Sequence, residues 1–293
     1  MVRKTGFTVA AFTAAALFSF ISFAQSGDWT PLLDKKLSQW DTYLSFAFTA
    51  DYKGEVVKDE NGNLVEPVGY NNDESEVFSI VKENKELILK VSGEIYGGIF
   101  TKQEYENYHL KLKVKWGAKK WPARKDKLMD SGILYHSIGE CGVDYWRSWM
   151  ISQEFQVMEG HMGDYWSIQD SKIDIRAYPH EGNINAVASK NQPFLPFGKG
   201  ERQYGFCKSD GDYESPAGEW TTLELVCFEG KSLHIVNGTV VMILQNSRYL
   251  DGEKTIPLTK GKILLQSEAA EVFYKDIAVK KLESLPSSYA SYF

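Results

Sequence analysis

Short runs in which apolar and polar residues alternate follow one another along most of the chain. Alternation with a period of two, in runs rich in β-branched and aromatic residues, is the pattern of strands that bury one face. The runs are residues 77–81, 86–93, 97–101, 108–116, 131–136, 154–159, 221–228, 232–244, 262–267 and 272–282. Asn237-Gly238 is a two-residue hairpin signal that divides one run into two paired strands. Because no stretch keeps a helical period, we predict an all-β sandwich of two antiparallel sheets.

Two long regions interrupt the strand pattern. Residues 51–74 are rich in Gly, Asn and charged residues, and residues 178–219 are rich in Pro, Gly and aromatic residues. Loops of this length in a compact domain are often binding loops or lids. No internal repeat or linker divides the chain, so residues 25–293 are predicted to form a single domain.

The first 24 residues are predicted to be a signal peptide. Arg3 and Lys4 precede an apolar run over residues 7–21, and the small residues Ser22 and Ala24 suit a cleavage site. The run is shorter than the roughly 20 residues that span a bilayer. We therefore expect a periplasmic or secreted protein with no membrane span after signal removal, and a retained anchor is the alternative.

The net charge limits the expected partners, and the cysteine spacing limits the expected metal, redox and disulfide sites. The net charge is −6, and no basic cluster is present, which excludes nucleic acid and anionic membranes as expected partners. Cys141, Cys207 and Cys227 lack the spacing of a metal or redox motif. Buried free thiols are predicted, and one disulfide in an oxidising compartment is the alternative.

The strongest candidate for chemistry is the polar stretch at residues 152–166. Alternation places Glu154 and Gln156 on one strand face and Phe155, Val157 and Glu159 on the other. A one-residue bulge near the end of this strand would bring Glu159 to the face of Glu154. Two glutamates so placed could perform acid and base catalysis on a glycosidic bond, and Gln156 could separate their pKa values. A solvated sheet face is the alternative.

Residues around this strand add candidate binding groups. His161, Asp164, Tyr165 and Trp166 follow it, in a composition typical of an aromatic-lined loop over a sugar. His136 ends another predicted strand. Each histidine could equally be structural. Together with the acidic strand they could hold a divalent cation, although no His-x-His or HExxH spacing supports a metal site.

Two further segments supply candidates. Trp146 offers a stacking face for sugar C–H groups and Arg147 offers a fork of hydrogen-bond donors, although the tryptophan could equally pack in a core. Glu268, at the end of a strand pattern beside small residues, could face the same cleft or end a sheet edge.

Several segments of the chain, taken in order along the sequence, resemble the 3-keto-disaccharide hydrolase family. They are "YGGIFTKQEYENYHLKLKVKWG", "DSGILYH", "EFQVMEGHMGDYW", "GEWTTLELVCFEGKSLHIVNG" and "GKILLQSEAAEVFYKDIAVKKL". The resemblance runs from Trp29 to about Leu282 and implies a concanavalin A-like jelly roll with a sugar cleft on its concave face. It maps the family's acidic strand onto Glu154, Gln156 and Glu159, and later family positions onto Asp164 and Glu268. The positions that depart from the family pattern look structural: Thr221, Lys275-Asp276 and Ala269.

The resemblance implies cleavage of a 3-keto-glycoside. The ketone acidifies the C2 proton, so a base can remove it, the C1 oxygen leaves, and water adds to the product. Such a route needs a base, an acid and a group that stabilises the enolate. Glu154 is the expected base and Glu159 or Glu268 the acid. His136, Arg147 or a divalent cation would stabilise the enolate, and no other cofactor is expected.

Two other functions fit the same residues. The run from Glu154 to Glu159 approaches the E-x-D-x-x-E pattern of laminarinase-type retaining endoglucanases, but Gln156 stands where that pattern has an aspartate. A carbohydrate-binding module would use the same carboxylates and tryptophans without turnover, because fold does not settle function.

Overall fold

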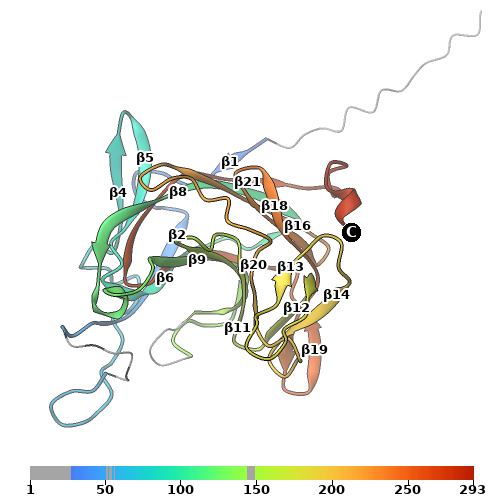
Figure 1. Ribbon diagram of the computed structural model, residues 1–293. Helices are drawn as coiled ribbons and strands as arrows, with labels where there is room; N and C mark the ends of the chain where they lie inside the picture. Colours follow the sequence, from blue (N-terminus) through green and yellow to red (C-terminus); the bar gives the residue numbers. More distant parts are fainter. Residues whose placement is uncertain (1–27, 51, 53–54, 56, 144–148) are drawn as a thin grey trace, which may run out of the picture.

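The protein is a sandwich of two antiparallel sheets. The computed structural model describes residues 28–50, 52, 55, 57–143 and 149–293, so the predicted signal peptide lies outside the described residues. Figure 1 shows two curved layers, with β8, β16, β18 and β21 in one and β2, β6, β9 and β20 in the other. The described part contains no α-helix, and none of its helices is long and apolar enough to cross a membrane. The predicted all-β jelly-roll class is confirmed.

The strands divide into a larger and a smaller sheet. Within the described residues the larger sheet has twelve strands: β1 (Thr30–Pro31), β4 (Phe78–Glu83), β5 (Glu86–Val91), β8 (Tyr108–Lys120), β12 (Ser171–Tyr178), β13 (Val187–Ala188), β14 (Phe194–Gly198), β16 (Thr221–Phe228), β17 (Lys231–Val236), β18 (Thr239–Asp251), β19 (Lys254–Pro257) and β21 (Ala270–Lys281). In the same part of the chain the smaller sheet has nine: β2 (Trp40–Ala47), β3 (Gly69–Tyr70), β6 (Ile95–Thr101), β7 (Tyr105–Glu106), β9 (Asp130–Ile138), β10 (Ile151–Met158), β11 (Tyr165–Ile168), β15 (Phe206–Cys207) and β20 (Lys260–Ser267). Two 3-10 helices, η1 (Pro122–Arg124) and η2 (Ala290–Tyr292), complete the described elements.

Alternation along the strands builds the core between the sheets. In β8, Leu110 and Leu112 point inward and lie opposite Leu225 and Leu223 of β16. Phe155 of β10 enters the same core from the other sheet, and it is fully buried. One face of β10 is therefore fixed against the core, which leaves its alternate residues on the outer face of the smaller sheet.

The predicted hairpin turn is confirmed. Val236 of β17 pairs with Thr239 of β18, which leaves Asn237 and Gly238 as the two turn residues. Their φ angles are 47° and 80°. Positive φ at both central positions is the geometry for which Asn-Gly is favoured, because it follows the twist of the strands.

The region 178–219, predicted as a long loop, contains three short strands instead. β14 pairs with β12 and places Phe197 opposite Ile173, both fully buried. β13 also pairs with β12, and β15 pairs with β11. These strands were missed because they are too short and too rich in Pro and Gly to alternate visibly.

The three cysteines lie apart as buried thiols. Cys141, Cys207 and Cys227 are free. Burial raises the pKa of the Cys141 thiol to about 12. The predicted free thiols are confirmed, and the disulfide alternative is not.

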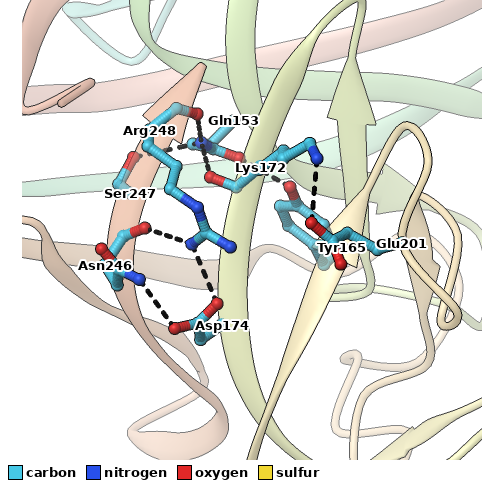
Figure 2. Close-up of polar contacts among 8 residues, drawn as sticks. All are labelled: Gln153, Tyr165, Lys172, Asp174, Glu201, Asn246, Ser247 and Arg248. Atoms are coloured by element: carbon cyan, nitrogen blue, oxygen red, sulfur yellow. Dashed lines mark hydrogen bonds and ion pairs between the residues drawn. The ribbon is translucent and has the colours of Figure 1, made fainter. Parts of the chain in front are cut away.

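Gln153 links the two sheets through its side chain. Figure 2 shows this amide at the centre of a network between β10 and the larger sheet. The Tyr165 hydroxyl donates to Oε1 of Gln153 at 2.6 Å, and Nε2 of Gln153 donates to the Lys172 carbonyl at 2.9 Å and to Oγ of Ser247 at 3.1 Å. Gln153 is fully buried. The network therefore fixes β10 against β12 and β18.

Replacing Gln153 with Met should destabilise the fold. The variant leaves the buried Tyr165 hydroxyl and the Lys172 carbonyl without these bonds, and we expect the free energy of unfolding to fall by about 2–3 kcal/mol. Denaturant titration measures the change. The same substitution at Gln39, whose amide donates to Pro31 in an exposed setting, is the control and should stay within about 0.5 kcal/mol. Equal effects at both positions would contradict a role for the network.

Candidate active site

A cleft of about 770 Å³ lies on the outer face of the smaller sheet. This volume is in the range of small-molecule sites. Six polar lining residues come from β9, β10 and β20 and from the segments beside them: Arg124, Asp130, Glu154, Gln156, Gln266 and Glu268. The polar lining also includes His161, Ser167, Gln169, Asn185 and Lys208. An aromatic side is formed by Trp166 and Phe206.

Strand register explains why these residues meet. Glu154 lies opposite Leu134 of β9 and Trp166 of β11, and Gln156 lies opposite Gly132 of β9. Residues directly opposite in an antiparallel pair point to the same face. Glu154 and Gln156 therefore point into the cleft together, as the alternation predicted.

Glu159 does not join them, which corrects the bulge prediction. The pairing of β10 with β9 is regular from Gln153 to Met158, and its register shift lies at the other end, between Ile151 and Gln153. The strand ends at Met158, and Glu159 is exposed and accepts a hydrogen bond from the Met129 amide at 3.3 Å. Glu159 is therefore outside the cleft lining.

Arg124, Asp130 and Glu268 form a buried acidic cluster at one end of the cleft. The Arg124 guanidinium pairs with Oδ2 of Asp130 and lies 2.6 Å from Oε1 of Glu268. Nε2 of Gln156 donates to Oδ1 of Asp130 at 2.7 Å. Asp130 is 3% and Glu268 8% exposed. One guanidinium is thus shared by two buried carboxyl groups.

The electrostatics of the acidic cluster favour proton uptake. Burial raises the pKa of Asp130 well above its ordinary value, the nearby negative charge of Glu268 raises it further, and Arg124 opposes both. Two carboxyls beside one cation titrate as a pair. Proton uptake by this pair is therefore easier than by an exposed carboxyl group, and both carboxyl groups line the cleft.

Sequence reasoning missed Asp130 and Arg124. Asp130 begins β9 and shares its face with Gly132 and Leu134, so extending the predicted run 131–136 back by one residue would have found it. Arg124 ends the short helix η1, where no periodicity marks a functional side chain.

Gly132 leaves the space in which two cleft side chains meet. A Cβ added at Gly132 would collide with Oε1 of Gln266 and Oε1 of Glu154. Both side chains therefore extend over this glycine, and their oxygens are neighbours. Because Gly132 has no side chain, β9 leaves space for the Glu154 and Gln266 side chains at this point of the cleft.

Replacing Gly132 with Ala should disturb Glu154 without touching the acidic cluster directly. The added methyl group forces Glu154 and Gln266 apart, and overpacking of this kind destabilises by about 1–3 kcal/mol. Displacement of a reacting group by about 1 Å lowers turnover by about 100-fold, so a fall of this size is expected if Glu154 takes part in a reaction. Steady-state kinetics with denaturant titration measures both changes. Unchanged turnover would show that the position of Glu154 is not critical.

The segment after β10 forms the aromatic side and its support. Trp166 is 42% exposed, and its ring centroid lies 4.5 Å from that of Phe206. His161 lines the cleft, and its Nδ1 lies 3.4 Å from Oδ2 of the buried Asp164. Asp164 also accepts a hydrogen bond from the Ser209 amide at 2.7 Å. Trp166 and His161 thus meet the cleft, whereas Asp164 holds the surrounding loops together.

Two other predicted residues lie elsewhere. Tyr165 pairs with Phe155 and therefore points into the core, where its hydroxyl bonds Gln153. His136 is buried away from the cleft lining, with the rings of Tyr108 and Tyr135 packed edge-on against it at 5.8 and 5.4 Å. Burial lowers the pKa of His136 to about 4. His136 is thus a neutral packing residue.

Trp146 and Arg147 lie outside the described residues. Within the residues that the structure does describe, no three His, Cys, Asp or Glu side chains come together as a ligand set for a metal ion. The positive charge that pairs with both the Asp130 and the Glu268 carboxyl groups is the Arg124 guanidinium.

A jelly-roll sandwich with carboxyl groups and an aromatic side in one cleft is the arrangement of a carbohydrate-active, glycosyl hydrolase-like domain, and the family match supports this class. The sequence profile of the 3-keto-alpha-glucoside-1,2-lyase-like domain family matches residues 28–280. The chain belongs to this family, which confirms the resemblance found in its sequence.

Solved structures with similar folds come from several bacteria. A candidate glycosyl hydrolase of Parabacteroides distasonis is 17% identical with a TM-score of 0.47, over 87% of this chain and 100% of that one. The β-glucanase of Bacillus licheniformis is 10% identical with a TM-score of 0.37, over 89% and 100%. The carbohydrate-binding module CBM66 of Bacillus subtilis is 7% identical with a TM-score of 0.38, over 70% and 92%. A search of curated proteins found no match.

Proposed function

We propose that this domain cleaves 3-keto-glycosides by removing the C2 proton, eliminating the group on C1 and adding water to the product. The observation that carries the proposal is the placement of Glu154 in the same cleft as the acidic cluster. Family membership supports the substrate class. The chemistry requires a base and an acid that can both reach the sugar, and Glu154 and the acidic cluster line the same cleft.

Glu154 is the proposed base. Its carboxylate takes the C2 proton, and the electron pair of that C–H bond forms a C2–C3 double bond while the ketone oxygen becomes an enolate. When the ketone re-forms, the pair moves to C1–C2 and the C1–oxygen bond breaks. The leaving oxygen takes a proton, and water then adds across the unsaturated ketone to give the free 3-keto sugar.

The acidic cluster is the proposed proton donor. Neighbouring residues on one strand face lie about 6.6 Å apart. Gln156 and Gly132 occupy the row between Glu154 and Asp130. A sugar lying over this row has Glu154 on one side and Asp130 with Glu268 on the other. A proton bound by one of these two carboxyl groups supplies the leaving oxygen.

The test is incubation of the purified protein with a 3-keto-glucoside beside the unoxidised glucoside. Loss of the alkaline ultraviolet absorbance of the 3-keto substrate reports cleavage, and product analysis separates an unsaturated ketone from its hydrate. Cleavage of the keto form alone is expected. Cleavage of the parent alone would indicate an ordinary glycosidase. Binding without cleavage of either would indicate a carbohydrate-binding module. Parallel reactions with a chelator test for a divalent cation.

A further inference from the structure

Gln266 is a buried amide in the cleft, and its polar atoms have no hydrogen-bond partner within the part of the chain that the structure describes. It lines the cleft, and its side chain is fully buried. Neither Oε1 nor Nε2 has a hydrogen-bond partner among the described residues. Its backbone is held, because the Ser131 hydroxyl donates to the Gln266 carbonyl at 2.8 Å. A buried amide without partners is destabilising, so a purely structural position would favour an apolar side chain.

Two other polar groups of the cleft are already engaged. The Gln156 amide donates to Asp130, and the Arg124 guanidinium is shared between Asp130 and Glu268. Gln266 differs from them because Nε2 has no acceptor among the described residues, so its hydrogens can donate to a ligand. Its unmet hydrogen-bonding capacity therefore lies beside the proposed base.

The place of Gln266 matches what an enolate requires. The proton that a base removes is on C2, and the oxygen that gains charge is on C3, the next carbon. A base and an oxyanion donor must therefore be neighbours. Oε1 of Glu154 and Oε1 of Gln266 extend over the same point above Gly132. His136, one of the predicted stabilisers, is buried and is not among the residues that line the cleft.

We propose that Gln266 stabilises the enolate by donating a hydrogen bond from Nε2 to the C3 oxygen of the substrate. This inference rests on the proposed function. As the C2–H bond breaks, the proton passes to Glu154 and the electron pair shifts to the C3 oxygen, where the amide hydrogen meets the growing charge. The amide keeps its proton throughout. When the ketone re-forms, the hydrogen bond weakens and the leaving oxygen departs.

The test compares the wild type with Gln266→Met on a 3-keto-glucoside carrying hydrogen or deuterium at C2. Loss of one oxyanion donor lowers kcat by about 100-fold. We expect that fall with a KM within threefold of the wild type. The deuterium isotope effect on kcat should rise, because C2–H cleavage becomes slower than later steps. The melting temperature should rise by about 2 °C, because an unpaired buried amide is removed.

Gln266→Glu gives a second readout. Its carboxyl can donate a hydrogen bond only when protonated, so kcat should fall as pH rises through the pKa of that carboxyl, in a limb that the wild type lacks. Gln39→Met is the matched control, since it removes a glutamine amide at the Pro31 segment, outside the cleft lining. It should change neither kcat nor the isotope effect.

The outcomes separate the two proposals. A wild type that cleaves no 3-keto-glycoside overturns the proposed function and this inference with it. A wild type that is active beside a Gln266→Met protein with kcat within threefold, or with an unchanged isotope effect, overturns this inference alone. If Gln266→Met does not fold, the Gln266→Glu pH profile decides, and the absence of the additional limb overturns the enolate role.

Discussion

Glu154→Gln is expected to lower kcat on a 3-keto-glucoside by about 1000-fold, the loss that follows removal of a general base. The amide has nearly the shape of the carboxylate but cannot take the C2 proton. Substrate binding should change little, because the side chain still occupies the cleft above Gly132. Steady-state kinetics gives kcat and KM, and the melting temperature reports whether the fold is kept.

Glu159→Gln is the matched control for this experiment. It makes the same chemical change just beyond the end of β10, where Glu159 is exposed and off the cleft lining. Its kcat should stay within twofold of the wild type. Turnover near the wild-type value in Glu154→Gln would remove Glu154 from the chemistry, and a large loss in Glu159→Gln would show that the cleft extends further than the structure indicates.

Arg124→Met is expected to lower the free energy of unfolding by about 3–5 kcal/mol at pH 7, because it leaves two buried carboxyl groups without their cation. Arg124 is the charge that opposes the raised pKa of Asp130. Without it, burial and Glu268 raise that pKa further above the value in the unfolded chain, which is about 3.9. The native variant then binds a proton that the unfolded chain releases.

The sign of the pH dependence follows from that difference. A carboxyl whose pKa is raised by folding contributes stability below its unfolded pKa and loses it as pH rises through the folded pKa. The loss in the free energy of unfolding of Arg124→Met, relative to the wild type, should therefore become smaller as the pH falls from 7 toward 4. Denaturant titrations at several pH values measure this trend. Arg124→Met combined with Asp130→Asn should have a smaller deficit at pH 7, and a deficit independent of pH would contradict the shared-charge arrangement.

Alternation with a period of two predicted the features of the fold that depend only on neighbouring residues in the sequence. It gave the all-β class and the common face of Glu154 and Gln156, and the Asn237-Gly238 signal gave the hairpin. Each of these features follows from the geometry of a strand pair and its turn. Because strand faces determine which side chains meet, much of the cleft was already implied by the sequence.

The remaining features depend on contacts between distant segments. The register shift in β10 lies beside Gln153, whose partners come from β11, β12 and β18, so its position could not be inferred from the strand alone. His136 has a φ of 53° beside an irregular pairing of β9 with β20. That backbone departs from regular alternation, so period two could not place its side chain. Arg124 reaches the cleft from η1, where only tertiary structure brings it to Asp130.

The fluorescence of Trp166 can report binding in the cleft. Its indole is 42% exposed and lies directly across the strand pair from Glu154. A ligand seated beside Glu154 would shield this ring from water and from a soluble quencher such as acrylamide. Fluorescence titration of Glu154→Gln, with a Trp166→Phe version to identify the signal, would therefore report substrate affinity when no turnover occurs.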